Sequence, residues 1–164
     1  QQSAGTRSEK GSTFIDVYAR RGIDVCQWLA RSRGCDTRRV DAAADLERLI
    51  ERYNDAWNAQ DVDAILALHA PGMVFENHTA SERVEGDDVG PHIARIFENW
   101  PDLTFRGRRL YARDGLVVSE WTATATASDG RRLEWDGIDV VPFEDGLIAR
   151  KDVYSSSHRA RVLE

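Results

Sequence analysis

The sequence has few cysteines, no long apolar run and no excess of basic residues. Its two cysteines, Cys26 and Cys35, are too few for a disulfide framework and predict reduced thiols in a cytoplasmic protein. No apolar stretch approaches the roughly 20 residues that span a bilayer, so we expect no membrane partner. The 28 acidic residues outnumber the 22 basic ones, and the net charge of −6 argues against a nucleic-acid partner.

Motifs for cofactors and metals are missing as well. The chain has no glycine-rich phosphate loop, no paired-cysteine motif and no nucleophile elbow, so we expect no cofactor. The four histidines lack the spacing of metal ligands and are predicted to be surface or capping residues: His69, His78, His92 and His158. We therefore expect no metal.

The 164 residues suffice for one domain with a real core, preceded by a segment of different composition. Residues 1–40 hold eight basic and four acidic residues among frequent glycines and serines. This composition predicts a poorly ordered or accessory extension, with an arm that packs on a partner or caps a pocket as the alternative. The domain itself is predicted over residues 41–157, with a loose polar tail over residues 158–164.

Three stretches carry the apolar periodicity of helices. The longest covers residues 41–61 and has an apolar face formed by Leu46, Leu49, Ile50, Tyr53 and Trp57. A shorter helix is predicted over residues 62–70, with Asp61 as its N-cap and Pro71-Gly72 as its stop. The third is predicted over residues 91–100, with Pro91 in its first turn.

Strand patterns dominate the rest of the chain. Residues 73–77, MVFEN, predict a first strand, and residues 80–88 are interpreted as a loop. Turns centred on Asp-Gly separate four further strands, predicted over Leu103–Arg113, Leu116–Ser128, Arg131–Phe143 and Leu147–Ser155. Helices followed by an antiparallel meander predict an α+β fold, in which N-terminal helices pack on a curved, mainly antiparallel sheet that encloses a pocket for a small molecule.

One strand raises a chemical question, because Asp139 lies in the apolar stretch LEWDGIDVVPFEDG. Alternation places its carboxyl group on the same face as Trp135, Val141 and Phe143. An ionised carboxylate is costly in such surroundings unless it is paired. Either an arginine on a neighbouring strand, Arg109 or Arg150, pairs with it, or it is protonated and becomes a hydrogen-bond donor.

Three other polar residues are candidates for the pocket. Tyr53 lies on the apolar face of the first helix, where its hydroxyl needs a partner, in the core or in the pocket. Asp152 in ARKDVYS is either an acid or base of the pocket or a surface partner of Arg150 or Lys151. Asn77 at the end of MVFEN is either a turn residue or a pocket amide.

Residues 45–155 resemble the SnoaL-like and ketosteroid-isomerase-like branch of the nuclear transport factor 2-like superfamily. The resemblance rests on ERYNDAWNAQDVDAILALHAPGMVFEN and GIDVVPFEDGLIARKDVY, and on the order of helices and strands. It implies a cone-like fold. It also implies that Tyr53 and Asp139 match the oxyanion-hole tyrosine and protonated aspartate of ketosteroid isomerases, whereas Asn77 stands where those enzymes have their general base.

The resemblance implies a cofactor-free enzyme that isomerises or cyclises an apolar, oxygenated, steroid- or polyketide-like substrate. Asp152 would transfer the proton, Tyr53 and Asp139 would stabilise an enolate, and Asn77 would orient substrate or water. The pocket walls are predicted to be Trp57, Phe75, Phe97, Trp121, Trp135 and Tyr154.

Two alternatives stay open at this point. One is hydration of an epoxide by Asp152 and Asn77, and the other is a dimeric ligand-binding module without catalysis. The family resemblance also implies a homodimer through the outer face of the sheet. On that face the strand-favouring stripe of Thr122, Thr124 and Thr126 would contribute to the interface.

Overall fold

The computed structural model describes residues 37–164, with side chains from Ala43 onward. Most of the predicted extension, residues 1–36, lies outside the described residues. The elements follow in the order α3 (Thr37–Asn58), α4 (Val62–Leu66), β1 (His69–Asn77), β2 (Glu82–Glu85), η1 (Gly86–Asp88), α5 (Val89–Asn99), β3 (Thr104–Arg113), β4 (Leu116–Thr126), β5 (Arg132–Glu144), β6 (Leu147–Ser155), η2 (Ser157–Arg159) and β7 (Arg161–Val162). No helix within residues 37–164 has both the length and the apolar character to cross a membrane.

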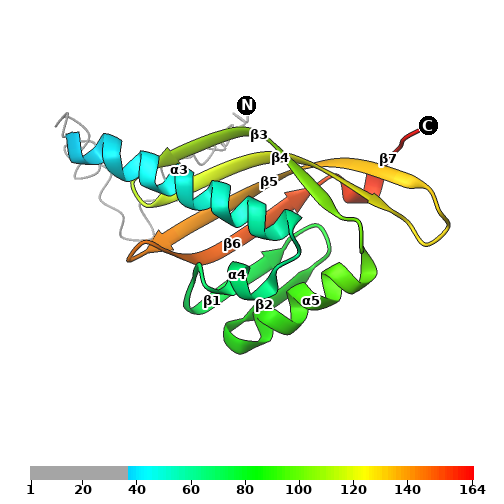
Figure 1. The fold of residues 1–164 in the computed structure, drawn as a ribbon, viewed down its shortest axis with the longest axis horizontal. Helices are drawn as coiled ribbons and strands as arrows, with labels where there is room; N and C mark the ends of the chain where they lie inside the picture. Colours follow the sequence, from blue (N-terminus) through cyan, green and yellow to red (C-terminus); the bar gives the residue numbers. More distant parts are fainter. Residues whose placement is uncertain (1–36) are drawn as a thin grey trace, which may run out of the picture. The chain divides into compact units, whose positions relative to one another are not determined.

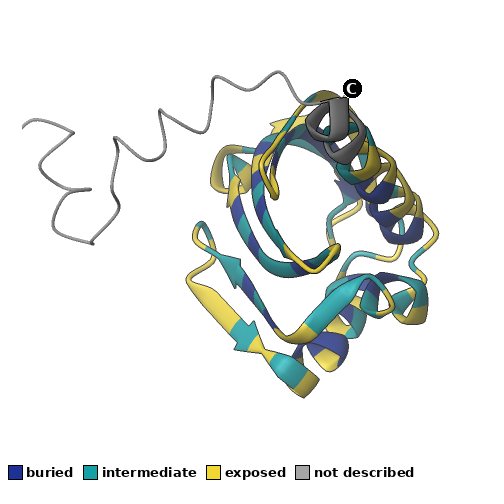
Figure 2. Ribbon diagram, turned by 90° about the vertical axis from the view of Figure 1, so that its left-hand side faces the viewer, coloured by how far each residue is buried: buried dark blue, intermediate teal, exposed yellow. Residues whose placement is uncertain are grey.

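The strands form one sheet in the order β2-β1-β6-β5-β4-β3, and the short β7 pairs with β5. Every neighbouring pair is antiparallel except β1 and β6, which run parallel. The sheet curls, with α3 across its concave side and α5 beside β1 and β2 (Figures 1 and 2). The predicted α+β class, with helices on a curved, mainly antiparallel sheet, is confirmed.

Two of the predicted hairpin turns have the backbone that aspartate and glycine favour. The pairs Asp114-Gly115 and Asp145-Gly146 both have positive φ at each residue, 48° and 77° in the first and 50° and 79° in the second. Two successive positive φ angles match the twist of the flanking strands, which is why Asp-Gly joins β3 to β4 and β5 to β6 so closely. These turns align the long strands of the meander.

Three local predictions differ from the structure. The second helix ends at Leu66, and β1 starts at His69 because this residue pairs with Ile148 of β6. The predicted loop contains β2, whose backbone pairs with β1 although its sequence is polar. The predicted loose tail contains β7, which pairs with the part of β5 around Leu133. The pairings of β1 with β6 and of β7 with β5 join residues distant in sequence, whereas β1 and β2 form a local hairpin.

The core lies between the concave face of the sheet and the helices. The apolar face of α3 is buried as its periodicity predicts, through Leu49, Ile50, Tyr53 and Trp57. From α5 the buried apolar residues include Ile93 and Phe97. Along most of β4, buried residues alternate with partly exposed ones, so one side of the sheet faces the core and the other faces outward (Figure 2).

Candidate functional site

A cavity of about 300 Å³ opens within the concave side of the sheet, and we call it the inner cavity. Six aromatic side chains line it, from α3, the end of α5 and four strands: Trp57, Phe75, Trp100, Phe105, Trp121 and Trp135. Asp139 of β5 and Lys151 of β6 also line it. The aromatic walls around a few polar groups give this cavity the composition of a small-molecule site.

Asp139 and Lys151 form a buried ion pair in this cavity. Nζ of Lys151 lies 3.0 Å from Oδ2 of Asp139, and each residue is only 6% exposed. In the sheet Asp139 stands opposite Val153, so Lys151 is its diagonal neighbour on the same face. The structure thus provides the paired alternative for Asp139, with Lys151 as the partner. The arginines considered from the sequence bind elsewhere, Arg109 to Glu120 and Arg150 to Asp152.

Aromatic rings surround the ammonium of Lys151. Nζ lies 4.5 Å from the ring centroid of Trp57, 5.2 Å from that of Tyr53 and 5.9 Å from that of Phe75. Burial by itself lowers the pKa of Lys151, but the carboxylate of Asp139, followed by the phenol of Tyr53, outweighs it and the net pKa is raised. Lys151 is therefore a cation at neutral pH, held by one carboxylate and by ring faces.

Tyr53 is buried next to Lys151 and does not line the inner cavity. Its hydroxyl forms a hydrogen bond of 3.0 Å with Nε2 of His69. Burial raises the pKa of Tyr53. Burial, followed by the charge of Lys151, lowers the pKa of His69 to about 4, so that this histidine is neutral at physiological pH. Tyr53 and Asp139 were expected to line one cavity, but only Asp139 lines the inner cavity. Lys151 lies near both residues.

Asp152 faces the outer side of the sheet, opposite to the inner cavity. Successive residues of a strand point to opposite faces, and Lys151 points inward. Asp152 accepts hydrogen bonds from Arg150 at 2.7 and 2.6 Å and is bonded to Nε2 of His78 at 2.8 Å. The hydrogen bonds from Arg150 are the main cause of the lowered pKa of Asp152. Of the two alternatives for Asp152, the structure thus has the pairing with Arg150 and not the position in the pocket.

Glu76, His78, Arg150 and Asp152 make up an outer-face cluster. Glu76, His78 and Asp152 each offer a metal-ligand atom within 4.8 Å of the others. Arg150, however, is bonded to both carboxylates and already supplies a positive charge to them. The ring of His78 stacks on Tyr154 with a centroid distance of 4.4 Å and an interplanar angle of 1°. The cluster is accordingly a saturated set of ion pairs.

The remaining predicted residues divide between the cavity and other places. Asn77 lines the inner cavity and is also a turn residue, since its Oδ1 accepts from the backbone N–H groups of Thr79 and Ala80 at 3.2 Å. Phe97 is buried and packs edge-on against Trp57, with ring centroids 5.3 Å apart. Tyr154, predicted as a wall, is 48% exposed on the outer face.

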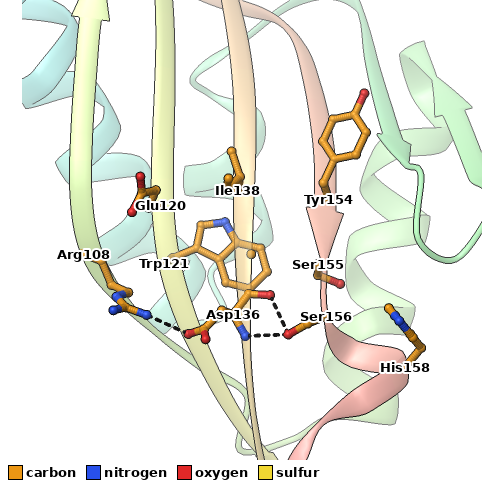
Figure 3. A pocket seen from close by; sticks show the side chains of 10 residues that line it. Arg108, Glu120, Trp121, Asp136, Ile138, Tyr154, Ser155, Ser156 and His158 are labelled. Atoms are coloured by element: carbon orange, nitrogen blue, oxygen red, sulfur yellow. Dashed lines mark hydrogen bonds and ion pairs between the residues drawn. The ribbon is translucent and has the colours of Figure 1, made fainter.

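A second hollow, of about 380 Å³, lies on the outer face (Figure 3). Arg108, Asp136, Ile138 and Tyr154 are among its lining residues, and Asp136 binds Arg108 at 3.1 Å. Trp121 lines both hollows, and its indole lies against Gly137. A Cβ added at Gly137 would be 2.2 Å from Cη2 of Trp121, so only glycine leaves room for the indole there.

Lys151 is the functional candidate that sequence reasoning missed. In ARKDVYS its neighbours Arg150 and Asp152 carry charge too, so composition did not single it out. The available signal was alternation with respect to Val153, since a lysine and a valine on one face of a strand indicate that the face is buried. Because charged residues lie at both odd and even positions of β6, the alternation did not clearly indicate which face is buried.

The match to known proteins agrees with this architecture. The family model described as SnoaL-like domain matches residues 50–151. The chain therefore belongs to the SnoaL-like family, and its fold is the α+β cone of nuclear transport factor 2-like proteins. No curated protein matches the chain.

Solved structures with similar folds come from several bacteria. A proposed SnoaL-like polyketide cyclase from Jannaschia sp. CCS1 is 17% identical with a TM-score of 0.65, and the match covers 77% of this chain and 93% of that one. A proposed ketosteroid isomerase from Kribbella flavida is 23% identical with a TM-score of 0.56, covering 70% and 80%. AclR from Streptomyces galilaeus, a proposed hydroxylase, is 21% identical with a TM-score of 0.61, covering 69% and 79%.

Proposed function

We propose that this protein is a cofactor-free enzyme that isomerises or cyclises an apolar, oxygenated small molecule in the inner cavity. The observation that carries the proposal is the ion pair of Asp139 and Lys151, buried among aromatic walls. The protein's membership of the SnoaL-like family supports an isomerase- or cyclase-type use of the fold. Steroid- and polyketide-like molecules have the apolar rings and carbonyl groups that such a cavity would take.

The pair divides acid–base chemistry between two groups. Oδ2 of Asp139 is held by Lys151, which leaves Oδ1 to take a proton from a carbon next to a substrate carbonyl. The carbonyl oxygen then becomes an enolate oxygen, and the ammonium of Lys151 stabilises this charge in a dry, low-dielectric site. Return of the proton to another carbon gives an isomer, whereas attack of the enolate on a second carbonyl closes a ring.

This assignment replaces the roles that the sequence suggested for other residues. Asp152 has no part in it, because it lies on the outer face with Arg150 and His78. The same placement removes the support for epoxide hydration by Asp152 and Asn77. Asn77 would instead offer the NH₂ end of its amide to the substrate at the cavity wall, since its Oδ1 is bonded in the turn.

A non-catalytic ligand-binding role is the second candidate, and one observation favours it. The carboxylate of Asp139 already has a cationic partner in Lys151, so the pair can serve to bind a polar ligand group without any turnover. The two candidates share the inner cavity and differ only in turnover. The two functions are therefore distinguished by measuring whether a bound ligand is converted to a product.

The test starts with a thermal-shift screen of steroid enones, anthraquinone-type polyketides and terpene epoxides. Compounds that stabilise the protein are incubated with it and analysed for isomerised or cyclised products by mass spectrometry and NMR. Asp139→Asn is expected to abolish turnover, and Lys151→Met to reduce it strongly. Asp152→Asn is the matched control, because it makes the same carboxylate-to-amide change next to Lys151, on the outer face of the sheet. Full turnover by Asp139→Asn would overturn the catalytic proposal, and ligands bound without turnover would support the binding role.

We also propose a homodimer through the outer face of the sheet. Its support is exposed apolar surface on that face, where Ile138 and Tyr154 are 41% and 48% exposed. The threonine stripe expected there is engaged within the chain instead, as when Thr122 donates to Asp136 at 2.7 Å. Light scattering of the wild type and of Ile138→Glu tests this, with a dimer and a monomer as the expected results. A monomeric wild type would contradict it.

A further inference from the structure

A small niche adjoins the inner cavity next to Asp139. It has a volume of about 10 Å³, which is the space of a single oxygen atom with its hydrogens. Its lining comprises Asn54, Trp57, Phe105, Gly107, Trp121, Asp139 and Lys151. Five of these residues also line the inner cavity, namely Trp57, Phe105, Trp121, Asp139 and Lys151. A group bound in the cavity can therefore extend one atom into the niche.

Three polar atoms of the niche residues lack a hydrogen-bond partner among residues 37–164. They are the indole Nε1 atoms of Trp57 and Trp121 and Oδ1 of Asp139, all fully shielded from solvent. These side chains come from α3, β4 and β5, and all three line the niche. Buried polar groups are nearly always paired in folded proteins, and a shared gap of this kind points to a ligand atom.

The chemistry of the three atoms restricts what can satisfy them. An indole N–H only donates, and an ionised carboxylate only accepts. The missing atom must therefore accept from at least one indole and donate to Asp139. A carbonyl or ether oxygen cannot donate, and an ammonium cannot accept. A hydroxyl oxygen does both, and the cation of Lys151 beside it favours an oxygen that carries partial negative charge.

We propose that the niche holds one hydroxyl oxygen between the two indole N–H groups and Oδ1 of Asp139. The hydroxyl belongs either to a water molecule or to an alcohol, phenol or enol group of the ligand in the inner cavity. In the second case the proposal rests on the proposed function and narrows its substrate class to hydroxylated or enolised ring compounds. Oδ1 of Asp139 then accepts a hydrogen bond from the substrate hydroxyl, which holds the ring next to the carboxylate that takes the proton from carbon.

Two measurements distinguish the sources of the hydroxyl. The first is the affinity of the protein for 2-naphthol, 2-methoxynaphthalene and naphthalene, by calorimetry. A ligand hydroxyl in the niche is expected to make 2-naphthol bind at least tenfold more tightly than its methyl ether. That preference should shrink in Trp57→Phe, Trp121→Phe and Asp139→Asn. Trp135→Phe, which alters the inner cavity but not the niche, should keep it.

The second measurement needs no ligand and no variant of uncertain folding. In the free wild-type protein, a bound water is expected to give nuclear Overhauser contacts to the indole N–H protons of Trp57 and Trp121. Water contacts without a naphthol preference support the water source, and a naphthol preference supports the ligand source. Equal affinities together with no water contact at either indole overturn the proposal. The turnover tests of Asp139 and Lys151 are independent of these results, so the two proposals fail separately.

Discussion

Replacing Lys151 with methionine is expected to destabilise the protein strongly. Methionine keeps most of the length and the apolar stem of the side chain but removes the ammonium from Oδ2 of Asp139, 3.0 Å away. Both residues are 6% exposed, so solvent cannot take over the role of the lost cation. The carboxylate of Asp139 would be left buried among Trp57, Trp121 and Phe75.

The expected loss follows from the cost of an unpaired buried charge. Removing one partner of a buried ion pair costs about 3–5 kcal/mol. Domains of this size have total stabilities of about 5–15 kcal/mol, so Lys151→Met should lose a large share. At this size the loss corresponds to a fall in Tm of roughly 10–20 °C. Replacing both partners, as in Asp139→Leu/Lys151→Met, should restore stability to within about 1–2 kcal/mol of the wild type, because no charge then remains buried.

Urea unfolding followed by far-ultraviolet circular dichroism measures these free energies of unfolding. The pH dependence adds a check on sign. The pair raises the pKa of Lys151 above its ordinary 10.5, so its stabilisation is complete below pH 10.5 and is lost as the pH rises through the raised pKa. The gap between wild type and Lys151→Met should narrow in strongly alkaline solution, where Lys151 of the wild type loses its charge. A single variant within about 1 kcal/mol of the wild type, or a double variant less stable than the single one, would refute the ion-pair reasoning.

Three further changes test other parts of the structure. The wild type should lose stability as the pH falls from 6.5 to about 4, and His69→Gln should flatten this slope, because burial depresses the pKa of His69 in the folded state. Gly137→Ala should cost about 1–3 kcal/mol in urea unfolding by displacing Trp121, whereas Gly107→Ala, with open space around its Cβ, should be near neutral. Asp61→Ala should cost about 1 kcal/mol by removing the N-cap of α4, and an unchanged midpoint would contradict the cap.

Local patterns were sufficient to predict most of the elements. Helical periodicity placed Tyr53 and Trp57 on the buried face of α3, and the Asp-Gly turns delimited the strands of the meander. Alternation within β5 placed Asp139 on the buried face, as the structure has it. These features depend on residues close together in the chain, and their physical causes act over the same short range.

The site was harder to predict because it depends on pairings between distant segments. Both faces of β6 carry charge, so its sequence did not indicate whether Lys151 or Asp152 lies inside. Parallel pairing with β1 decides the matter, since Phe75 stands beside Lys151, and Glu76 beside Asp152. No local sequence pattern predicts the parallel pairing of β1 with β6. The pairing of Asp139 with Lys151 and the contact of Asp152 with His78 were therefore not predicted, whereas Arg150 was one of the predicted partners of Asp152.

The charges of β6 also disfavour a shifted register of this strand in the sheet. A shift of this strand by one residue would turn Arg150 and Asp152 toward the aromatic cavity and expel Lys151 from it. Asp139 would lose its cation, and Glu76, 74 residues away from Arg150 in the chain, would lose its own. Each face of the strand thus recognises only its proper neighbours. The ion pair of Asp139 and Lys151 would therefore also favour the correct register of β6 during folding, because sheets with a shifted register would leave Asp139 without its cation.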